Sequence, residues 1–152
     1  MKTTKSLAMM MWSIFIVVPG LHAACSTASI AGRFGFTTTG SIPALGQVVA
    51  TGIFTQDASG NITGTQTRSL NGSVAAETFT GTATVNSDCT GTDSIQVFQD
   101  ESLVRTTTLH VVYDDNGREV RAIFTSLVLP NGVSLPSIIT IEARKLFSRE
   151  AD

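Results

Sequence analysis

Histidine is scarce in this chain, which has two histidines in 152 residues, together with one tryptophan and one tyrosine. Of the two histidines, His22 falls in the N-terminal leader described below, so His110 is the histidine that remains after it. A Ser/His/Asp triad or a Cys/His pair needs an oriented histidine beside a nucleophile, and the chain has no Gly-x-Ser-x-Gly sequence. A zinc site needs several His or Cys ligands. We therefore expect no catalytic triad, no metal site and no cofactor.

Charged residues make up only 14% of the chain, and the basic ones are scattered. Without Lys2 and Lys5 of the leader, eight basic side chains stand against twelve acidic ones, a formal charge of −4. A protein that binds nucleic acid usually gathers its basic residues in a patch, so we expect no nucleic-acid partner. The segment Asp57-Ala58-Ser59-Gly60-Asn61 has the spacing of half a calcium loop but no Glu at the twelfth position, and a Gly-closed turn explains it as well.

Long apolar runs are missing apart from one near the N-terminus. Lys2 and Lys5 precede an apolar run over residues 7–18, and small residues follow up to Ala24. The run is too short to span a bilayer and is typical of a secretory signal peptide. We predict a signal peptide over 1–24, a single β-barrel domain over 25–146 and a short charged tail over 147–152. The mature protein is expected to be secreted or periplasmic, with no transmembrane segment.

Two cysteines, Cys25 and Cys89, remain after the leader. In an oxidising compartment two cysteines are expected to form a disulfide, which would tie down the N-terminus and stabilise the fold by roughly 4 kcal/mol. The alternative makes Cys25 the lipid-bearing first residue of a bacterial lipoprotein. Such signals usually have Leu three residues before the Cys, where this chain has His22.

The segment from Ile30 to Arg144 consists of short runs rich in Thr, Val, Ile and Phe, separated every eight to twelve residues by Gly, Asn or Asp. This rhythm predicts an all-β domain of about eight antiparallel strands. About eight strands are enough to close a sheet on itself, so we predict an up-and-down barrel.

One hairpin can be given a register. The pair Asn116-Gly117 suits a two-residue type I′ turn, which would pair Asp115 with Arg118 and extend as the pairs Tyr113–Val120, Val111–Ala122 and Leu109–Phe124. These last three pairs share an apolar face, which we assign to the interior. Arg105 follows on the same face, either as a solvated charge at the barrel mouth or as a polar contact for a ligand.

The sequence resembles a group of small exported bacterial β proteins. The resemblance rests on Gly32-Arg33-Phe34, on the turn Phe54-Thr55-Gln56-Asp57-Ala58-Ser59-Gly60-Asn61 and on Ala83-Thr84-Val85-Asn86-Ser87-Asp88-Cys89-Thr90-Gly91. The barrel is also similar to the lipocalin-like (calycin) superfold, whose members commonly hold one small apolar molecule, and to allene oxide cyclase barrels. Lipocalins have Gly-x-Trp in the first strand and an Arg near the last, where this chain has Phe34 and Arg144.

Three functions remain open. The first is binding of a small apolar or amphipathic ligand without chemistry, for which the interior candidates are Phe34, Phe36, Arg105, Leu109, Tyr113 and Phe124. The second is a cofactor-free isomerase or cyclase of a lipid-like or polyketide-like substrate, which acts mainly by folding the substrate and would use Arg105, Tyr113 and Glu77. The third is a surface adhesion or interaction module that uses the Thr-rich outside. The sequence does not indicate the ligand or the oligomeric state.

Overall fold

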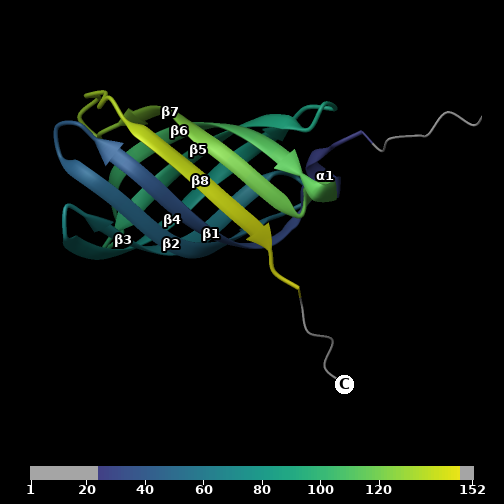
Figure 1. Cartoon of the computed structure of the whole chain (residues 1–152), viewed down its shortest axis with the longest axis horizontal. Coiled ribbons are helices and arrows are strands. Elements are labelled where there is room, and N and C mark those ends of the chain that lie inside the picture. Colours follow the sequence, from purple (N-terminus) through teal and green to yellow (C-terminus); the bar gives the residue numbers. More distant parts are fainter. Residues whose placement is uncertain (1–23, 148–152) are drawn as a thin grey trace, which may run out of the picture.

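The chain forms one closed, antiparallel β-barrel (Figure 1). The structure is a computed structural model that describes residues 24–147; residues 1–23 of the predicted signal peptide and residues 148–152 of the predicted tail lie outside the described residues. Each strand pairs with its neighbours in sequence order, and the last pairs with the first, which confirms the predicted up-and-down barrel. The elements are α1 (Thr27–Ile30), β1 (Gly32–Ile42), β2 (Gly46–Gln56), β3 (Asn61–Leu70), β4 (Ser73–Val85), β5 (Thr90–Gln99), β6 (Ser102–Asp114), the short 3-10 turn η1 (Asp115–Gly117), β7 (Glu119–Val128) and β8 (Ile138–Lys145).

Inward and outward side chains alternate along most of each strand, with interruptions where the pairing shifts near Val97 on β5 and Leu109 on β6. In β1, Phe34 and Phe36 are buried and Thr37 is exposed, and in β5 the buried Ile95 and Val97 are separated by the exposed Gln96. Because successive side chains of a strand point to opposite faces, the apolar and threonine residues separate into a core and an outer wall.

The hairpin of β6 and β7 has the predicted register but a different turn. Tyr113 pairs with Val120, and the interior pairs Val111–Ala122 and Leu109–Phe124 follow, as predicted. The predicted pair between Asp115 and Arg118 is absent, because the last pair is Asp114–Glu119 and both residues lie in a four-residue loop. The prediction of a two-residue turn was therefore wrong.

One end of the barrel is closed by α1 (Figure 1). A disulfide joins Cys25 to Cys89 in the turn between β4 and β5, which confirms the predicted pairing; in this form the Cys25 sulfur is not free to carry a lipid. Ile30 at the end of α1 is 1% exposed and belongs to the core cluster that includes Val111 and Tyr113. The disulfide is compatible with an extracellular or periplasmic location.

The opposite end is lined by apolar side chains from the strand ends and from the loops. Ile42, Val48, Leu127 and Ile139 form a second core cluster there, and Leu135 from the segment between β7 and β8 packs against it. The two ends therefore differ: a helix and a disulfide cover one, and apolar side chains of the strand ends and loops line the other.

Candidate functional site

The barrel contains a cavity of about 220 Å³. It extends from Phe36 and Phe79 in the larger core cluster to side chains of the loop end, including Leu45, Leu129 and Leu135. Most of its lining is aliphatic or aromatic, and four charged side chains reach it: Arg68, Glu77, Asp93 and Arg105. Apolar pockets with a few placed polar groups are typical of small-molecule sites.

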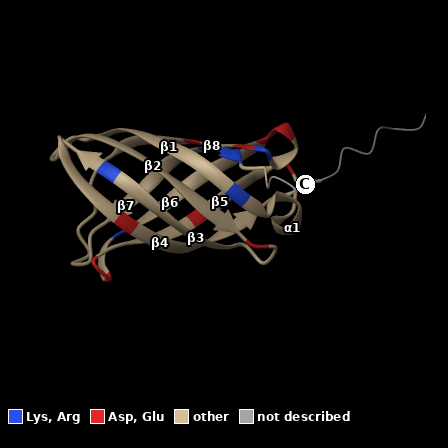
Figure 2. Ribbon diagram, turned by 90° about the horizontal axis from the view of Figure 1, so that it is seen from below, with Lys and Arg blue, Asp and Glu red and all other residues tan. Residues whose placement is uncertain are grey.

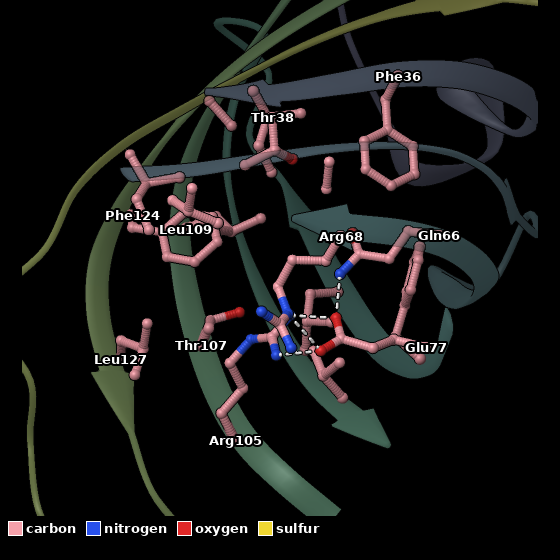
Figure 3. A pocket seen from close by; sticks show the side chains of 18 of the residues that line it. Phe36, Thr38, Gln66, Arg68, Glu77, Arg105, Thr107, Leu109, Phe124 and Leu127 are labelled. Carbon is pink, nitrogen blue, oxygen red and sulfur yellow. Dashed lines mark hydrogen bonds and ion pairs between the residues drawn. The ribbon is translucent and has the colours of Figure 1, made fainter. Parts of the chain in front are cut away.

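A charged cluster occupies the β3–β6 side of this cavity (Figure 3). The carboxylate of Glu77 accepts two parallel hydrogen bonds from Arg105, from Nη1 at 2.8 Å and from Nη2 at 2.7 Å. It also accepts hydrogen bonds from Nε of Arg68 and from Nε2 of Gln66, each at 2.7 Å. We call Gln66, Arg68, Glu77 and Arg105 the Glu77 cluster.

Strand geometry brings these residues together from three different strands. Gln66 and Arg68 are two apart on β3, and both line the cavity, as does Glu77 on β4. Arg105 is on β6, beyond β5, at a point where the pairing of these strands shifts between Val97 and Phe98. A β-bulge of this kind bends a strand and redirects its side chains.

The Glu77 cluster carries one more positive than negative charge. Burial would raise the pKa of Glu77, but the hydrogen bonds and charge of Arg105, with hydrogen bonds from Arg68 and Gln66, outweigh it and lower the pKa to about 2. Glu77 is therefore ionised at neutral pH and balances one of the two guanidinium groups. The Nη1 atom of Arg68 is buried and has no hydrogen-bond partner within the described residues. Glu77 therefore leaves one positive charge of the cluster without a counter-charge.

A second polar group lies nearer the α1 end. Asp93 is 8% exposed and lines the cavity; its Cα partners are Ala83 on β4 and Leu109 on β6. No described side chain hydrogen-bonds its Oδ1 atom. Burial raises the pKa of Asp93 to about 7, so its neutral and ionised forms are both populated near neutral pH.

Tyr113 lies beside Asp93 but outside the cavity lining. Burial and then the Asp93 charge raise the pKa of Tyr113, and the Gln56 side chain opposes them. Its hydroxyl and Nε2 of Gln56 are buried without a well-formed hydrogen bond in the described residues. Tyr113 is thus neutral at physiological pH.

The sequence-based candidates separate into two groups, those that line the cavity and those that do not. Phe36, Arg105, Leu109 and Phe124 line the cavity, and so does Glu77. Phe34 is fully buried and stacks on Phe54 with ring centroids 4.9 Å apart, and Phe34 and Tyr113 are core residues that do not line the cavity. The interpretation of Arg105 as a solvated charge was wrong, because its side chain is 15% exposed and ion-paired to Glu77.

The sequence reasoning did not find Gln66, Arg68 or Asp93. A signal was present for each: all three stand at inward positions of their strands, in step with Ile62 on β3 and Ile95 on β5. Once the inward and outward faces of a strand have been assigned, a single polar or charged residue at an inward position indicates a polar site inside the barrel.

The outer surface carries the remaining histidine. His110 is exposed on β6, on the face opposite the buried Leu109 and Val111. Within residues 24–147, no group of three or more His, Cys, Asp or Glu side chains is placed to hold a metal ion. Asp57 uses its carboxylate in its own turn, accepting hydrogen bonds from the backbone N–H groups of Ser59 and Asn61.

No protein-family model matches this chain, and no curated protein matches it. The closed eight-stranded barrel is consistent with a calycin-like architecture. Among the described residues, none of the helices has the length and apolar character required to cross a bilayer.

Proposed function

We propose that this protein is an exported container for a slender amphipathic anion, such as a medium-chain carboxylate, and that it binds this molecule without transforming it. The observation that carries the proposal is the union of an apolar cavity with a Glu77 cluster that has one uncompensated positive charge. The apolar part of the ligand would lie among the aliphatic and aromatic side chains, and its acid group would approach Arg68.

The size of the cavity supports a narrow ligand. Pockets for drug-sized ligands usually measure about 300–1,000 Å³, and this cavity has about 220 Å³. A single alkyl chain suits such a volume better than a fused ring system or a two-chain lipid does. The apolar side chains at the loop end, including Leu45 and Leu135, give such a chain a compatible point of entry.

The charge at Arg68 supports an anionic head group. Arg105 commits both Nη atoms to Glu77, whereas Arg68 donates through Nε and keeps Nη1 without a partner among the described residues. A guanidinium group binds a carboxylate through two parallel N–H donors. A ligand carboxylate at Arg68 would satisfy the buried nitrogen and neutralise the cluster.

The same contacts weigh against the residues of the cyclase hypothesis. Both carboxylate oxygens of Glu77 are engaged by cationic or amide donors, and its lowered pKa makes it a weak base. Arg105 is held in the same ion pair, and Tyr113 does not line the cavity. Groups that act as general acids or bases are most effective with a pKa near the working pH, so binding is the function that these residues support best.

The test compares dodecanoate with dodecanol by isothermal titration calorimetry on the mature, oxidised protein. We expect dodecanoate to bind at least tenfold more tightly. Arg68→Met should remove this preference, because it leaves Glu77 and Arg105 as a neutral pair. Arg121→Met, which removes an exposed cation on β7, is the control and should keep it. Failure of the wild-type protein to bind either molecule would overturn the proposal.

A further inference from the structure

Asp93 is a buried acid for which the fold provides no counter-charge. Its pKa is shifted by burial alone, whereas two arginines surround Glu77. The neighbouring inward side chains on the flanking strands are Ala83 on β4 and Leu109 on β6, both apolar. Leaving a carboxyl oxygen buried without a partner costs free energy, so the free protein retains Asp93 at a cost.

The groups that face Asp93 do not remove this cost. Tyr113 on β6 is the titratable neighbour, and it is affected by the charge of Asp93. Gln56 on β2 acts on Tyr113, and its Nε2 is itself without a partner among the described residues. His110 is on the outer face of β6, where it acts on Asp88 in the β4–β5 turn. No described side chain donates a hydrogen bond to Oδ1 of Asp93, and because Asp93 lines the cavity, a molecule held there can supply the donor.

Asp93 and the Glu77 cluster lie far apart along the barrel. Asp93 is level with Ala83 on β4, and Glu77 is six residues from Ala83 on that strand, a separation of about 20 Å along β4. Because strands of such a barrel are tilted by roughly 35–45°, the separation along the barrel axis is about 15 Å. A molecule with its acid group at Arg68 would reach Asp93 with its opposite end.

We propose that the ligand of this barrel is a hydroxylated amphipathic acid, and that its distal hydroxyl donates a hydrogen bond to the Oδ1 atom of Asp93. This inference rests on the proposed function, to which it adds a second polar contact and hence a substrate class. The unpartnered, buried oxygen that lines the cavity carries the argument. A ligand hydroxyl at that point would donate a hydrogen bond to Oδ1 of Asp93, whereas an alkyl end would leave this oxygen without a donor.

Two probes test the inference: dodecanoate and ω-hydroxydodecanoate, titrated calorimetrically into the mature protein at pH 8. We expect the hydroxylated acid to bind about tenfold more tightly, since hydrogen bonds to charged groups are among the stronger ones. Asp93→Leu should reverse the order and favour dodecanoate. Asp100→Asn, a change to an exposed turn residue whose positive φ suits Asn, is the matched control and should keep the wild-type preference.

A second measurement needs no variant. The Asp93 carboxyl carbon is followed by NMR over a pH titration, free and with each probe. A hydroxyl that donates to the ionised carboxylate stabilises that form, so ω-hydroxydodecanoate should lower the titration midpoint relative to dodecanoate. Equal affinities and equal midpoints for the two probes would overturn the role of Asp93 and leave the container function standing. Absence of binding by both would overturn the container function itself.

Discussion

Glu77 and Asp93 are both buried acids on adjacent strands, and their surroundings move their pKa values in opposite directions. For Glu77, donors from Arg105, Arg68 and Gln66 overcome the effect of burial and lower the pKa to about 2. For Asp93 burial is unopposed and raises the pKa to about 7. Near neutral pH the cavity thus has a fixed ion pair at one level and a group that changes charge at another.

Asp93 should make the protein less stable as the pH rises from 4 to 7. Its carboxyl ionises near pH 3.8 when unfolded and near pH 7 when folded, so unfolding releases a proton in this range. Each pH unit lowers the free energy of unfolding by about 1.4 kcal/mol, up to about 4 kcal/mol above pH 7. Asp93→Asn should therefore be more stable than the wild type at pH 8 and nearly equal to it at pH 4, as measured by urea denaturation. A constant difference at both pH values would contradict this.

Glu77→Gln should destabilise the protein by about 3 kcal/mol at pH 7, because it leaves two partly buried guanidinium groups, each on a side chain that is 15% exposed, without a counter-charge. The sign with pH is opposite to that of Asp93. The stabilisation by Glu77 is fully present above its unfolded pKa of 4.5 and is lost as the pH falls towards 2. Denaturation midpoints of the variant and wild type should converge over that range.

The control for Glu77 is Glu119→Gln on β7. Glu119 pairs with Arg144, whose side chain is 83% exposed, and exposed pairs contribute about 0–1 kcal/mol. An equal loss of stability in both variants would show that the Glu77 cluster is no more than a surface-like ion pair.

At the scale of the elements, α1 depends on its attachment to the β4–β5 turn. The disulfide joins residues 64 positions apart, and Ile30 then covers the core at that end. Replacing both cysteines, by Cys25→Ser with Cys89→Ser, should lower the free energy of unfolding by roughly 4 kcal/mol. The barrel and the binding of dodecanoate should survive, because the Glu77 cluster belongs to strands near the other end. Loss of binding in a variant that is still folded would contradict this separation of the two ends.

How much of the fold and of the site follows from the sequence can be judged from one hairpin and one ion pair. The Asn116-Gly117 signal was enough to pair Leu109 with Phe124, because side-chain alternation carries the register along both strands. The extra loop residues changed the turn without changing that register. The sequence also predicted the number of strands. Their order follows the chain, which is the simplest order that closes a sheet into a barrel.

The ion pair between Glu77 and Arg105 could not be predicted in the same way. These residues are on β4 and β6, which are separated by β5, so their meeting depends on two registers and on the bulge near Val97. No local turn signal determines that combination. Asp93 was within reach of sequence reasoning, but its pKa depends on what surrounds it in the closed barrel.

The whole molecule has an unusual distribution of charge. Strands β2, β3, β4 and β5 together contain three charged residues, Arg68, Glu77 and Asp93, and all three line the cavity. Figure 2 shows most of the other charged segments towards the two ends of the barrel. Surfaces usually carry the charges and cores exclude them. In these four strands the charged residues lie inside the barrel and none lies on its outer surface. Apolar residues at the same inward positions would stabilise the fold at least as well, so this distribution supports the proposal that the interior polar groups bind a ligand.

The same four strands leave an uncharged, threonine-rich outer wall, which is the basis of the interaction-module hypothesis. Its exposed apolar members include Val49 and Val74. A substitution that fills the interior should abolish the binding of a ligand inside the barrel but should not affect a partner bound to the outer wall. One interior variant can therefore distinguish the two hypotheses.

That variant is Ala122→Phe. Ala122 on β7 lines the cavity between Val111 and Ile141, its Cα partners, and a phenyl ring there would fill space that the ligand needs. We expect a folded barrel with equal or higher thermal stability, since filling a cavity adds contacts, and at least a tenfold loss of affinity for dodecanoate in calorimetry. Ile123→Phe, the adjacent residue on the outer face and 48% exposed, should leave the affinity unchanged. The reverse result, with binding lost in the outer variant and kept in the inner one, would place the ligand on the outer wall and favour an interaction module over a container.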